Sequence, residues 1–148
     1  MNCKMNLALY TKRHNAVLDI LANLLIKAGL NPAVNLQSEG SELRPDIEIS
    51  GSRILMDVRI SYDEISNLEQ ARDEKVAKYR DLGTPLPLIV GSLGSWPPFN
   101  DDIRAFLYIS GRRWATFRRK ARVAAIKGSM EIIHESLKAH GTAGDPDP

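Results

Sequence analysis

The chain has 148 residues, of which 43% are hydrophobic and 26% are charged, with a formal net charge of +2. This balance is typical of a soluble globular protein, and the length suits one domain that buries its own core. No apolar run approaches the roughly 20 residues that cross a bilayer, and the start lacks the apolar segment of a signal peptide, so we expect no membrane partner. Cys3 is the single cysteine, which excludes an intrachain disulfide and favours an intracellular protein or a piece of one.

The first half of the chain predicts a helix, an edge strand and a β-hairpin. Apolar residues recur at helical spacing over 13–28, and Gly29 is placed to end that helix. A short apolar stretch at 33–36 is typical of an edge strand. Residues 44–50 and 53–60 alternate apolar and polar side chains on either side of a Gly-Ser turn, which predicts two paired strands.

The second half predicts a helix, a buried strand and two further helices. Acidic residues open a helix over 63–82, and a short apolar run at 86–90 indicates a buried strand. A third helix is expected from residue 100 or 101 to residue 109, and a long final one over 112–140. Residues 141–148 carry no large apolar side chain, so we expect a disordered tail.

Together these elements predict the α/β fold class in one domain that covers residues 1–140. A hairpin followed by a helical crossover to another strand gives a mixed sheet, with helices packed on its faces. The hairpin carries acidic residues, and further helices follow at the C-terminal end. No internal repeat and no linker divides the chain.

Two aspartates, Asp46 and Asp57, interrupt the apolar pattern of the two predicted hairpin strands. A carboxylate in a buried strand costs desolvation free energy unless it is paired or binds a metal ion. Two carboxylates that converge from adjacent strands offer the oxygen ligands that Mg²⁺ prefers, and such an ion can bind a substrate phosphate and activate water. The pair predicts a metal site for phosphodiester chemistry; the alternative is two acids that face solvent.

The second predicted helix carries two lysines with different directions. Lys75 lies in the middle of the stripe that should face the sheet, whereas Lys78 lies at the edge of that stripe. A lysine that points toward the sheet needs an anionic partner, and Asp46 and Asp57 are the obvious ones. The alternative is that Lys75 extends along the surface to solvent. Tyr79 shares the stripe, where a plain core role is the more common one.

His14 and a basic segment are further candidates. His14 stands on the apolar side of the first predicted helix, where a histidine is usually a satisfied core or capping residue. From Arg112 to Lys127 there are seven basic residues and no acidic one. Arg112, Arg119 and Arg122 fall on one side at helical spacing, which suits contact with a phosphate backbone or an ordinary solvated face.

Five short blocks stand in a recognisable order over about residues 10–134. They are Lys12-Arg13-His14-Asn15, Arg44-Pro45-Asp46, Asp57 about a dozen positions later, Lys75-Val76-Ala77-Lys78-Tyr79 and Gly91-Ser92-Leu93-Gly94-Ser95-Trp96. In these blocks the chain resembles the restriction-like endonuclease domain of site-specific non-LTR (LINE-type) retrotransposon proteins, within the PD-(D/E)XK nuclease superfamily. The resemblance implies a restriction-endonuclease-like core with the same hairpin and helix.

The resemblance also implies roles for individual residues. Asp46 and Asp57 would hold Mg²⁺ or Mn²⁺, and Lys75 would complete the catalytic set of a DNA endonuclease. The usual lysine two positions after the second acid is Arg59 here, which cannot act as a base, so the lysine of the following helix takes its place. The residues expected to contact DNA are Lys12, Arg13, His14, Arg44, Arg59, Lys78, Arg112, Arg119 and Arg122.

In the parent proteins such a domain cleaves target DNA and leaves a 3′ end that reverse transcription extends. The implied partners are therefore target DNA, the reverse transcriptase domain and the element RNA, with a nuclear location if the element is eukaryotic. Residues 1–9 resemble the end of a preceding zinc knuckle with Cys3 as its last ligand, and because one cysteine cannot hold zinc we expect no zinc site. Whether Glu48 or His14 joins the metal site stays open.

Two other functions stay open at this point. One is a stand-alone nuclease like the Holliday-junction resolvases, which would act on branched DNA as a homodimer. The other is a DNA-binding module that has lost catalysis. Intact Asp46, Asp57 and Lys75 argue against the second, because a module free to drift has no need of acids that repel phosphate.

Overall fold

The computed structural model describes residues 3–35 and 44–141. The polar loop predicted at 37–42 lies outside the described residues, and so does the tail predicted at 141–148 apart from Gly141, which ends the last helix. Within the described part of the chain, no helix is both long enough and apolar enough to cross a membrane.

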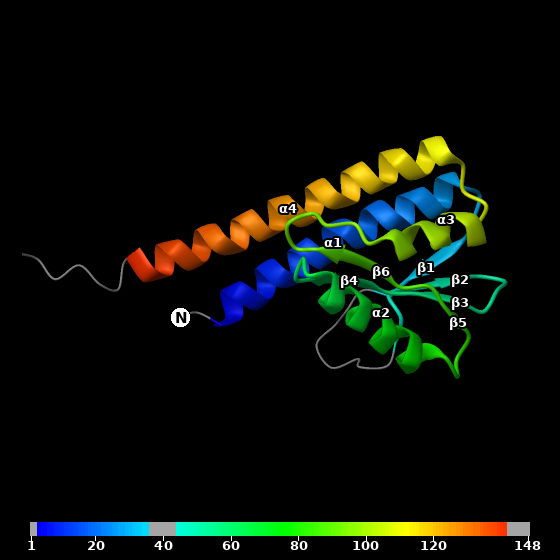
Figure 1. Ribbon diagram of the computed structural model, residues 1–148, viewed down its shortest axis with the longest axis horizontal. Coiled ribbons are helices and arrows are strands. Elements are labelled where there is room, and N and C mark those ends of the chain that lie inside the picture. Colours follow the sequence, from blue (N-terminus) through cyan, green and yellow to red (C-terminus); the bar gives the residue numbers. More distant parts are fainter. Residues whose placement is uncertain (1–2, 36–43, 142–148) are drawn as a thin grey trace, which may run out of the picture.

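In chain order, α1 is followed by four strands, then α2, then two further strands and the remaining helical elements (Figure 1). The helices are α1 (Cys3–Lys27), α2 (Ile65–Tyr79), α3 (Asp101–Phe106) and α4 (Gly111–Gly141), with a 3-10 turn, η1 (Pro98–Asn100). The strands are β1 (Pro32–Val34), β2 (Ile47–Ile49), β3 (Ile54–Met56), β4 (Val58–Ser61), β5 (Thr84–Pro85) and β6 (Leu88–Gly91). The predicted α/β class is confirmed.

The strands form a mixed arrangement. β1, β2 and β3 pair antiparallel in that order, which confirms the predicted edge strand and hairpin. β3 pairs with β5 and β4 pairs with β6, both in parallel. The two parallel pairings have the same register. Ile54 pairs with Thr84 and Val58 pairs with Leu88, so in both cases the partners are separated by the same number of residues. In the chain, α2 lies between β4 and β5. It forms the crossover connection that parallel strands require.

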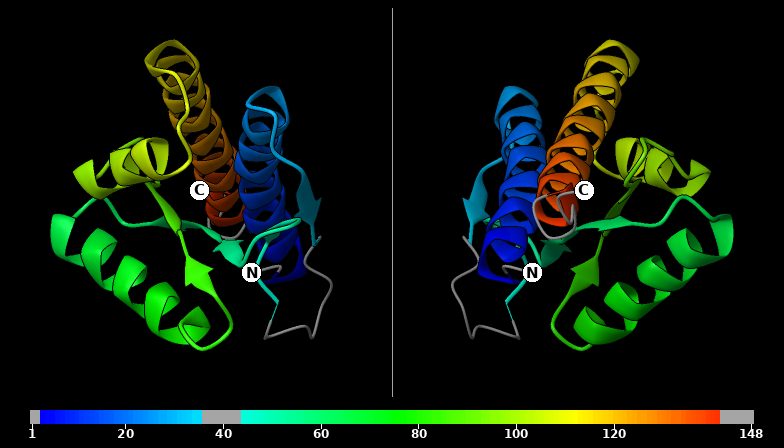
Figure 2. Two further views of the ribbon diagram at one scale, coloured as in Figure 1. Left: turned by 90° about the vertical axis from the view of Figure 1, so that its right-hand side faces the viewer. Right: turned by 90° about the vertical axis from the view of Figure 1, so that its left-hand side faces the viewer.

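Helices cover both faces of the strands. α1 and α4 lie side by side and antiparallel on one face, and α2 covers the other (Figures 1 and 2). Leu88 and Val90 of β6 join the main core beneath α1 and α4. Ile89, between them, packs in a smaller cluster with Leu68 and Ala71 of α2. A strand alternates its side chains between two faces, and helices cover both faces of β6. All of its side chains are therefore apolar.

α1 begins earlier than the periodicity of its apolar residues predicts. The residues before 13 include apolar ones, but Leu7 is 64% and Tyr10 is 48% exposed, so they do not continue the buried stripe of the helix. This part of α1 contacts α4 instead. For example, Nζ of Lys12 on α1 lies 3.0 Å from Oε2 of Glu131 on α4. The segment that the resemblance assigns to the end of a zinc knuckle is helical from Cys3 onward.

The second predicted hairpin strand is divided into β3 and β4 at Asp57. The backbone N–H of Asp46 donates to Oδ1 of Asp57 at 2.8 Å, and the N–H of Val58 donates to Oδ2 of Asp46 at 2.8 Å. At this point side-chain oxygens take the hydrogen bonds that a regular antiparallel ladder would give to carbonyl oxygens. The two aspartates themselves therefore interrupt the strand.

The helix predicted to end at residue 109 stops at Phe106. Tyr108 has a φ of 55°, which ends helical geometry, and α4 begins at Gly111. The long final helix is confirmed. The strand predicted at 86–90 is β6, and the short β5 before it was not expected because it ends in Pro85.

Candidate functional site: a buried pair of aspartates

The two predicted metal-binding acids lie together at the end of the hairpin. Asp46 immediately precedes β2 and Asp57 immediately follows β3, and the pairing of Ile47 with Met56 places them opposite each other. The two hydrogen bonds described above join each carboxylate to the backbone of the opposing segment. Asp46 is 1% and Asp57 is 3% exposed. The hairpin thus holds two almost fully buried carboxyl groups side by side.

One basic side chain from each helical layer contacts this pair. Nζ of Lys75, on α2, lies 2.7 Å from Oδ2 of Asp57, so its predicted inward direction is confirmed. Nε2 of His14, on α1, lies 3.0 Å from Oδ2 of Asp46. Both side chains are largely buried. His14, which the sequence suggests as a capping residue or a DNA contact, is a direct partner of an acid.

These groups shift one another's pKa values. Burial raises the pKa of Asp57 and the charge of Asp46 raises it further, and together these two effects outweigh the hydrogen bond and charge of Lys75, which lower it. Burial also raises the pKa of Asp46, but the hydrogen bond and charge of His14, with hydrogen bonds from Val58 and Asp57, together hold it below its ordinary value. Burial lowers the pKa of His14, yet the hydrogen bond to Asp46 leaves it above its ordinary value. Asp46 is therefore the more firmly ionised acid.

Tyr79, at the end of α2, belongs to the same cluster. Its side chain is buried, and its hydroxyl donates to the carbonyl oxygen of Arg44 at 3.2 Å. Burial, together with the charges of Asp57 and Asp46, raises the pKa of Tyr79, so the phenol stays protonated in the neutral range. Lys78 is exposed, with Nζ 5.2 Å from the centre of the Tyr79 ring, as its position at the edge of the stripe predicts.

The donors present suit a hard cation. Asp46 and Asp57 supply carboxylate oxygens, and Mg²⁺ is commonly bound by one or two carboxylates, with water and substrate oxygens completing the set. Glu48, two positions along the hairpin, is exposed. In the described part of the chain, no group of three or more His, Cys, Asp and Glu side chains is arranged to hold a metal ion.

Two of the predicted DNA contacts form exposed ion pairs. Nζ of Lys12 lies 3.0 Å from Glu131, and Nη1 of Arg59 lies 2.6 Å from Glu74. All four side chains are well exposed, and ion pairs in solvent contribute little to stability, so a phosphate can replace either acid. The geometry leaves both residues available as phosphate contacts.

Arg13 faces into the molecule. Its Nη1 donates to Oγ of Ser129 at 2.9 Å, and its guanidinium lies 5.0 Å from the centre of the Tyr10 ring. A Cβ at Gly128 would collide with its side chain, so α4 passes close by. These contacts support a packing role between α1 and α4. Arg44, which is exposed, stays a predicted DNA contact.

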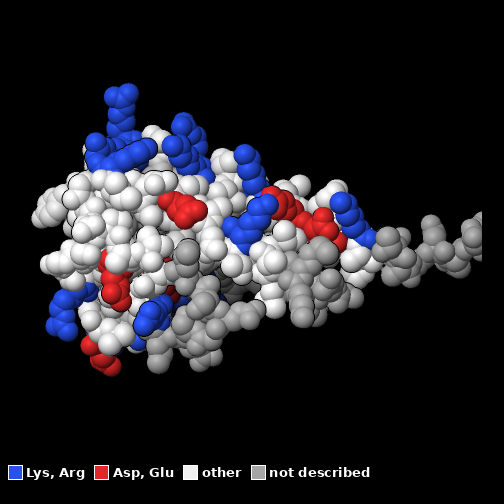
Figure 3. All heavy atoms as spheres, turned by 180° about the vertical axis from the view of Figure 1, so that it is seen from behind, with Lys and Arg blue, Asp and Glu red and all other residues white. Residues whose placement is uncertain are grey.

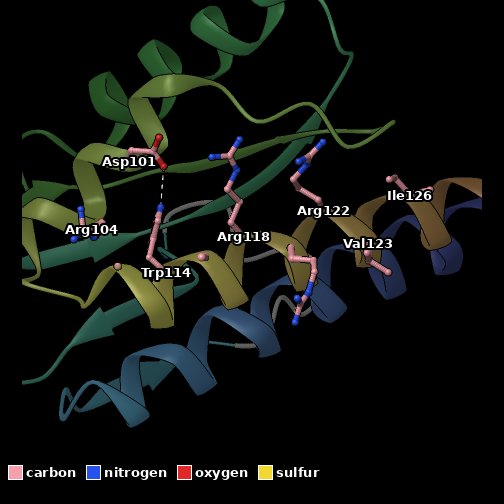
Figure 4. A pocket seen from close by; sticks show the side chains of 10 residues that line it. Asp101, Arg104, Trp114, Arg118, Arg122, Val123 and Ile126 are labelled. Atoms are coloured by element: carbon pink, nitrogen blue, oxygen red, sulfur yellow. Dashed lines mark hydrogen bonds between the residues drawn. The ribbon is translucent and has the colours of Figure 1, made fainter.

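The predicted basic face of α4 is divided between two grooves. Arg112 lines a groove between α1 and α4, whereas Arg119 and Arg122 line a pocket between α3 and α4 (Figure 4). Lysine and arginine side chains gather along the edge of the molecule that α4 forms (Figure 3). The three arginines do not make one continuous surface, because other helices flank α4 on both sides.

The glycine-rich block after β6 is organised by Asp63, a role that the sequence did not reveal. Its carboxylate accepts hydrogen bonds from Oγ of Ser92 at 3.0 Å and from the N–H groups of Leu93 at 2.8 Å and Ser95 at 3.0 Å. A Cβ at Gly91 would collide with this carboxylate. Burial raises the pKa of Asp63, but the hydrogen bonds outweigh it and leave the pKa below its ordinary value.

Comparison with known proteins assigns no family to the chain. No family model matches the sequence, and no curated protein matches it. The function is therefore inferred from the cluster of Asp46 and Asp57 with His14 and Lys75.

Proposed function

We propose that this chain is a metal-dependent DNA endonuclease domain of the restriction-like, PD-(D/E)XK kind. The observation that carries this proposal is the buried pair of Asp46 and Asp57 at the hairpin end, with Nζ of Lys75 2.7 Å from Asp57. A hairpin followed by a helix and a further parallel strand is also the arrangement that the resemblance implies.

Stability is a poor explanation for this cluster. Removing an ionised group from water costs several kcal/mol, and replacing buried ion pairs by apolar side chains is often neutral or stabilising. The raised pKa of Asp57 indicates that the fold disfavours its charge. Titratable groups with shifted pKa values gather at functional sites, so a cluster that is costly to bury favours a chemical role.

Each residue of the cluster has a role in this proposal. Asp46 and Asp57 would hold Mg²⁺ or Mn²⁺, which when bound supplies a Lewis acid for the scissile phosphate and lowers the pKa of water. Lys75 donates hydrogen bonds to the attacking water or to a phosphate oxygen, where its charge stabilises the negative charge that develops. His14 keeps the carboxylate of Asp46 ionised and oriented.

DNA is the proposed substrate because exposed basic residues are available to a phosphate backbone. Such contacts position a nucleic acid without reading its sequence. The proposed backbone contacts outside α4 are Lys12, Arg44, Arg59 and Lys78. Cleavage of target DNA for target-primed reverse transcription, the reverse transcriptase and RNA partners, and a nuclear location are proposed on the resemblance alone.

Plasmid nicking tests the proposal. The purified chain should convert supercoiled plasmid to the nicked form with Mg²⁺ or Mn²⁺, and EDTA should stop the reaction. Asp57→Asn keeps the shape of the side chain but removes its charge, so single-turnover nicking should fall by about 100-fold or more. Asp19→Asn, which changes an exposed acid of α1, is the matched control and should nick normally.

Three results would redirect the proposal. DNA binding without nicking under any divalent ion would indicate a module that has lost catalysis. Cleavage confined to branched DNA by a dimer would indicate a junction-resolving nuclease. Equal nicking by Asp57→Asn and the unchanged chain would place the chemistry outside this cluster.

A further inference from the structure

A pocket of about 650 Å³ lies between α3 and α4 and shares no residue with the aspartate cluster. Four arginines line it, Arg104 from α3 and Arg118, Arg119 and Arg122 from α4 (Figure 4). Its volume is within the range of pockets that hold small molecules, about 300 to 1,000 Å³.

The lining holds one acidic residue, Asp101, whose hydrogen bonds go to two tryptophans. Its Oδ1 accepts from the indole N–H of Trp114 at 2.8 Å (Figure 4) and from that of Trp96 at 3.2 Å. Within the described residues, none of the four arginines forms an ion pair. Nε of Arg122 donates to the carbonyl oxygen of Gly94 at 2.7 Å, which fixes its position and leaves the other donors of the guanidinium. With one carboxylate beside four guanidinium groups, the pocket lining has an excess of positive charge.

Apolar surface forms much of the remaining lining. Val123 and Ile126 are 43% and 37% exposed, and Ala115 is exposed beside them. A simple anion would contact the arginines and leave this surface in water. A ligand that uses both carries an anionic group next to an apolar one, as a nucleotide does with its phosphate and its base. Guanidinium groups also stack on the faces of bases.

We propose that this pocket binds about one or two unpaired nucleotides of a nucleic acid strand. In a duplex the base faces are stacked inside, so only phosphates would reach the arginines and the apolar lining would stay unused. The choice of a nucleic acid rests on the proposed nuclease function, but the pocket is a separate binding site. A single strand held here would bind in addition to the strand that is cut.

Fluorescence anisotropy in EDTA tests this site without cleavage. The probes are oligothymidylate and oligouridylate of about 12 nucleotides, with a duplex of the same length as comparison. The exposed pair Arg104→Ala with Arg119→Ala should weaken single-strand binding by about ten-fold and flatten its logarithmic salt dependence by about 1.4. The two single strands show whether DNA or RNA is preferred.

Two further variants keep the test sharp. Lys27→Ala with Lys120→Ala removes equal charge from the groove between α1 and α4 and should change single-strand affinity by less than about two-fold. Ala115→Leu fills the pocket without changing charge and should weaken single-strand binding but not duplex binding. Equal losses in the two charge pairs, or full binding by Ala115→Leu, would overturn the proposal. So would competition by polyglutamate as strong as that by the oligonucleotides, which would indicate an acidic protein partner.

The outcome is independent of nicking. If the chain fails to nick plasmid but its variants show these binding losses, the pocket proposal stands and the nuclease proposal fails. If the chain nicks plasmid but binds no single strand, the nuclease proposal stands and the pocket proposal fails.

Discussion

Asp46 donates its backbone N–H to Oδ1 of Asp57 at 2.8 Å, while its own carboxylate accepts the N–H of the residue that follows Asp57. The two acids are thus fixed by the hairpin backbone as well as by their side-chain partners. Neither can swing into solvent without breaking a backbone hydrogen bond. A site whose ligands are fixed before substrate arrives loses little entropy when it becomes occupied, which suits the proposed role.

The two lysines of α2 should have separate effects. Lys75→Met removes the ammonium that lies 2.7 Å from Asp57, so single-turnover cleavage should fall by about 100-fold while DNA affinity changes little. Lys78→Met removes an exposed charge and should weaken DNA binding, with a smaller salt dependence, while cleavage of bound DNA continues. Binding and single-turnover cleavage are measured for both variants.

The reverse pattern would contradict these roles. Loss of chemistry in Lys78→Met with normal cleavage by Lys75→Met would assign the catalytic ammonium to Lys78. Normal cleavage by both variants would turn attention to Arg59, the cation at the position where the related nucleases carry lysine.

His14 should make stability depend on pH. Its pKa in the folded chain lies above the ordinary value of 6.5, so its protonated form favours folding. That contribution is complete below the unfolded-state pKa and is lost as the pH rises through the higher folded-state pKa. His14→Gln should therefore destabilise the chain by about 1.5 to 3 kcal/mol at pH 5.5 and by less at pH 9.

Urea unfolding in EDTA measures this difference. His134→Gln, which changes an exposed histidine of α4, is the control and should be neutral at both pH values. A loss of stability for His14→Gln that is the same at both pH values would show that the hydrogen bond matters and the charge does not.

The sequence predicts Asp46, Asp57 and Lys75 correctly as neighbours because local periodicity decides their directions. Strand alternation puts both acids on one face, and helical spacing turns Lys75 toward the sheet. The contact of His14 with Asp46 joins residues 32 positions apart, and it depends on where α1 crosses the strands. Spacing shows that His14 faces inward but does not identify its partner.

In α4, too, spacing predicts which side chains are buried but not which elements pack against the helix. Its inner residues Trp114, Phe117 and Ala121 are buried as their spacing predicts. Its arginines are divided between two grooves because α1 and α3 pack on either side, and a helical wheel of α4 contains no information on its neighbours. The early start of α1 is not predicted for a related reason, since Leu7 and Tyr10 are apolar but exposed, and this part of the helix contacts α4.

Asp63 should be required for the loop after β6. Asp63→Ala removes the acceptor of three hydrogen bonds, and we expect a loss of about 1 to 3 kcal/mol in the free energy of unfolding. The amides of Leu93 and Ser95 should exchange with solvent faster, which hydrogen exchange detects. Asp73→Ala, at an exposed position of α2, should change neither quantity. Unchanged exchange at Leu93 and Ser95 would show that the strands beside the loop hold it without Asp63.

Tyr108 should be a position where glycine is more stable than the native residue. Its φ is 55°, a left-handed conformation that costs an L-residue about 1 to 2 kcal/mol, and its side chain is 95% exposed. The N–H groups of Tyr108 and Ile109 donate to the carbonyl oxygens of Ala105 at 3.3 Å and Arg104 at 3.0 Å, the pattern of a helix end that favours glycine. Tyr108→Gly should raise the free energy of unfolding by up to about 1 kcal/mol. Ala105→Gly, at an exposed position inside α3, should lower it by about 1 kcal/mol, because that residue is helical. If urea unfolding shows both variants destabilised, the Tyr108 ring contributes contacts that outweigh its backbone strain.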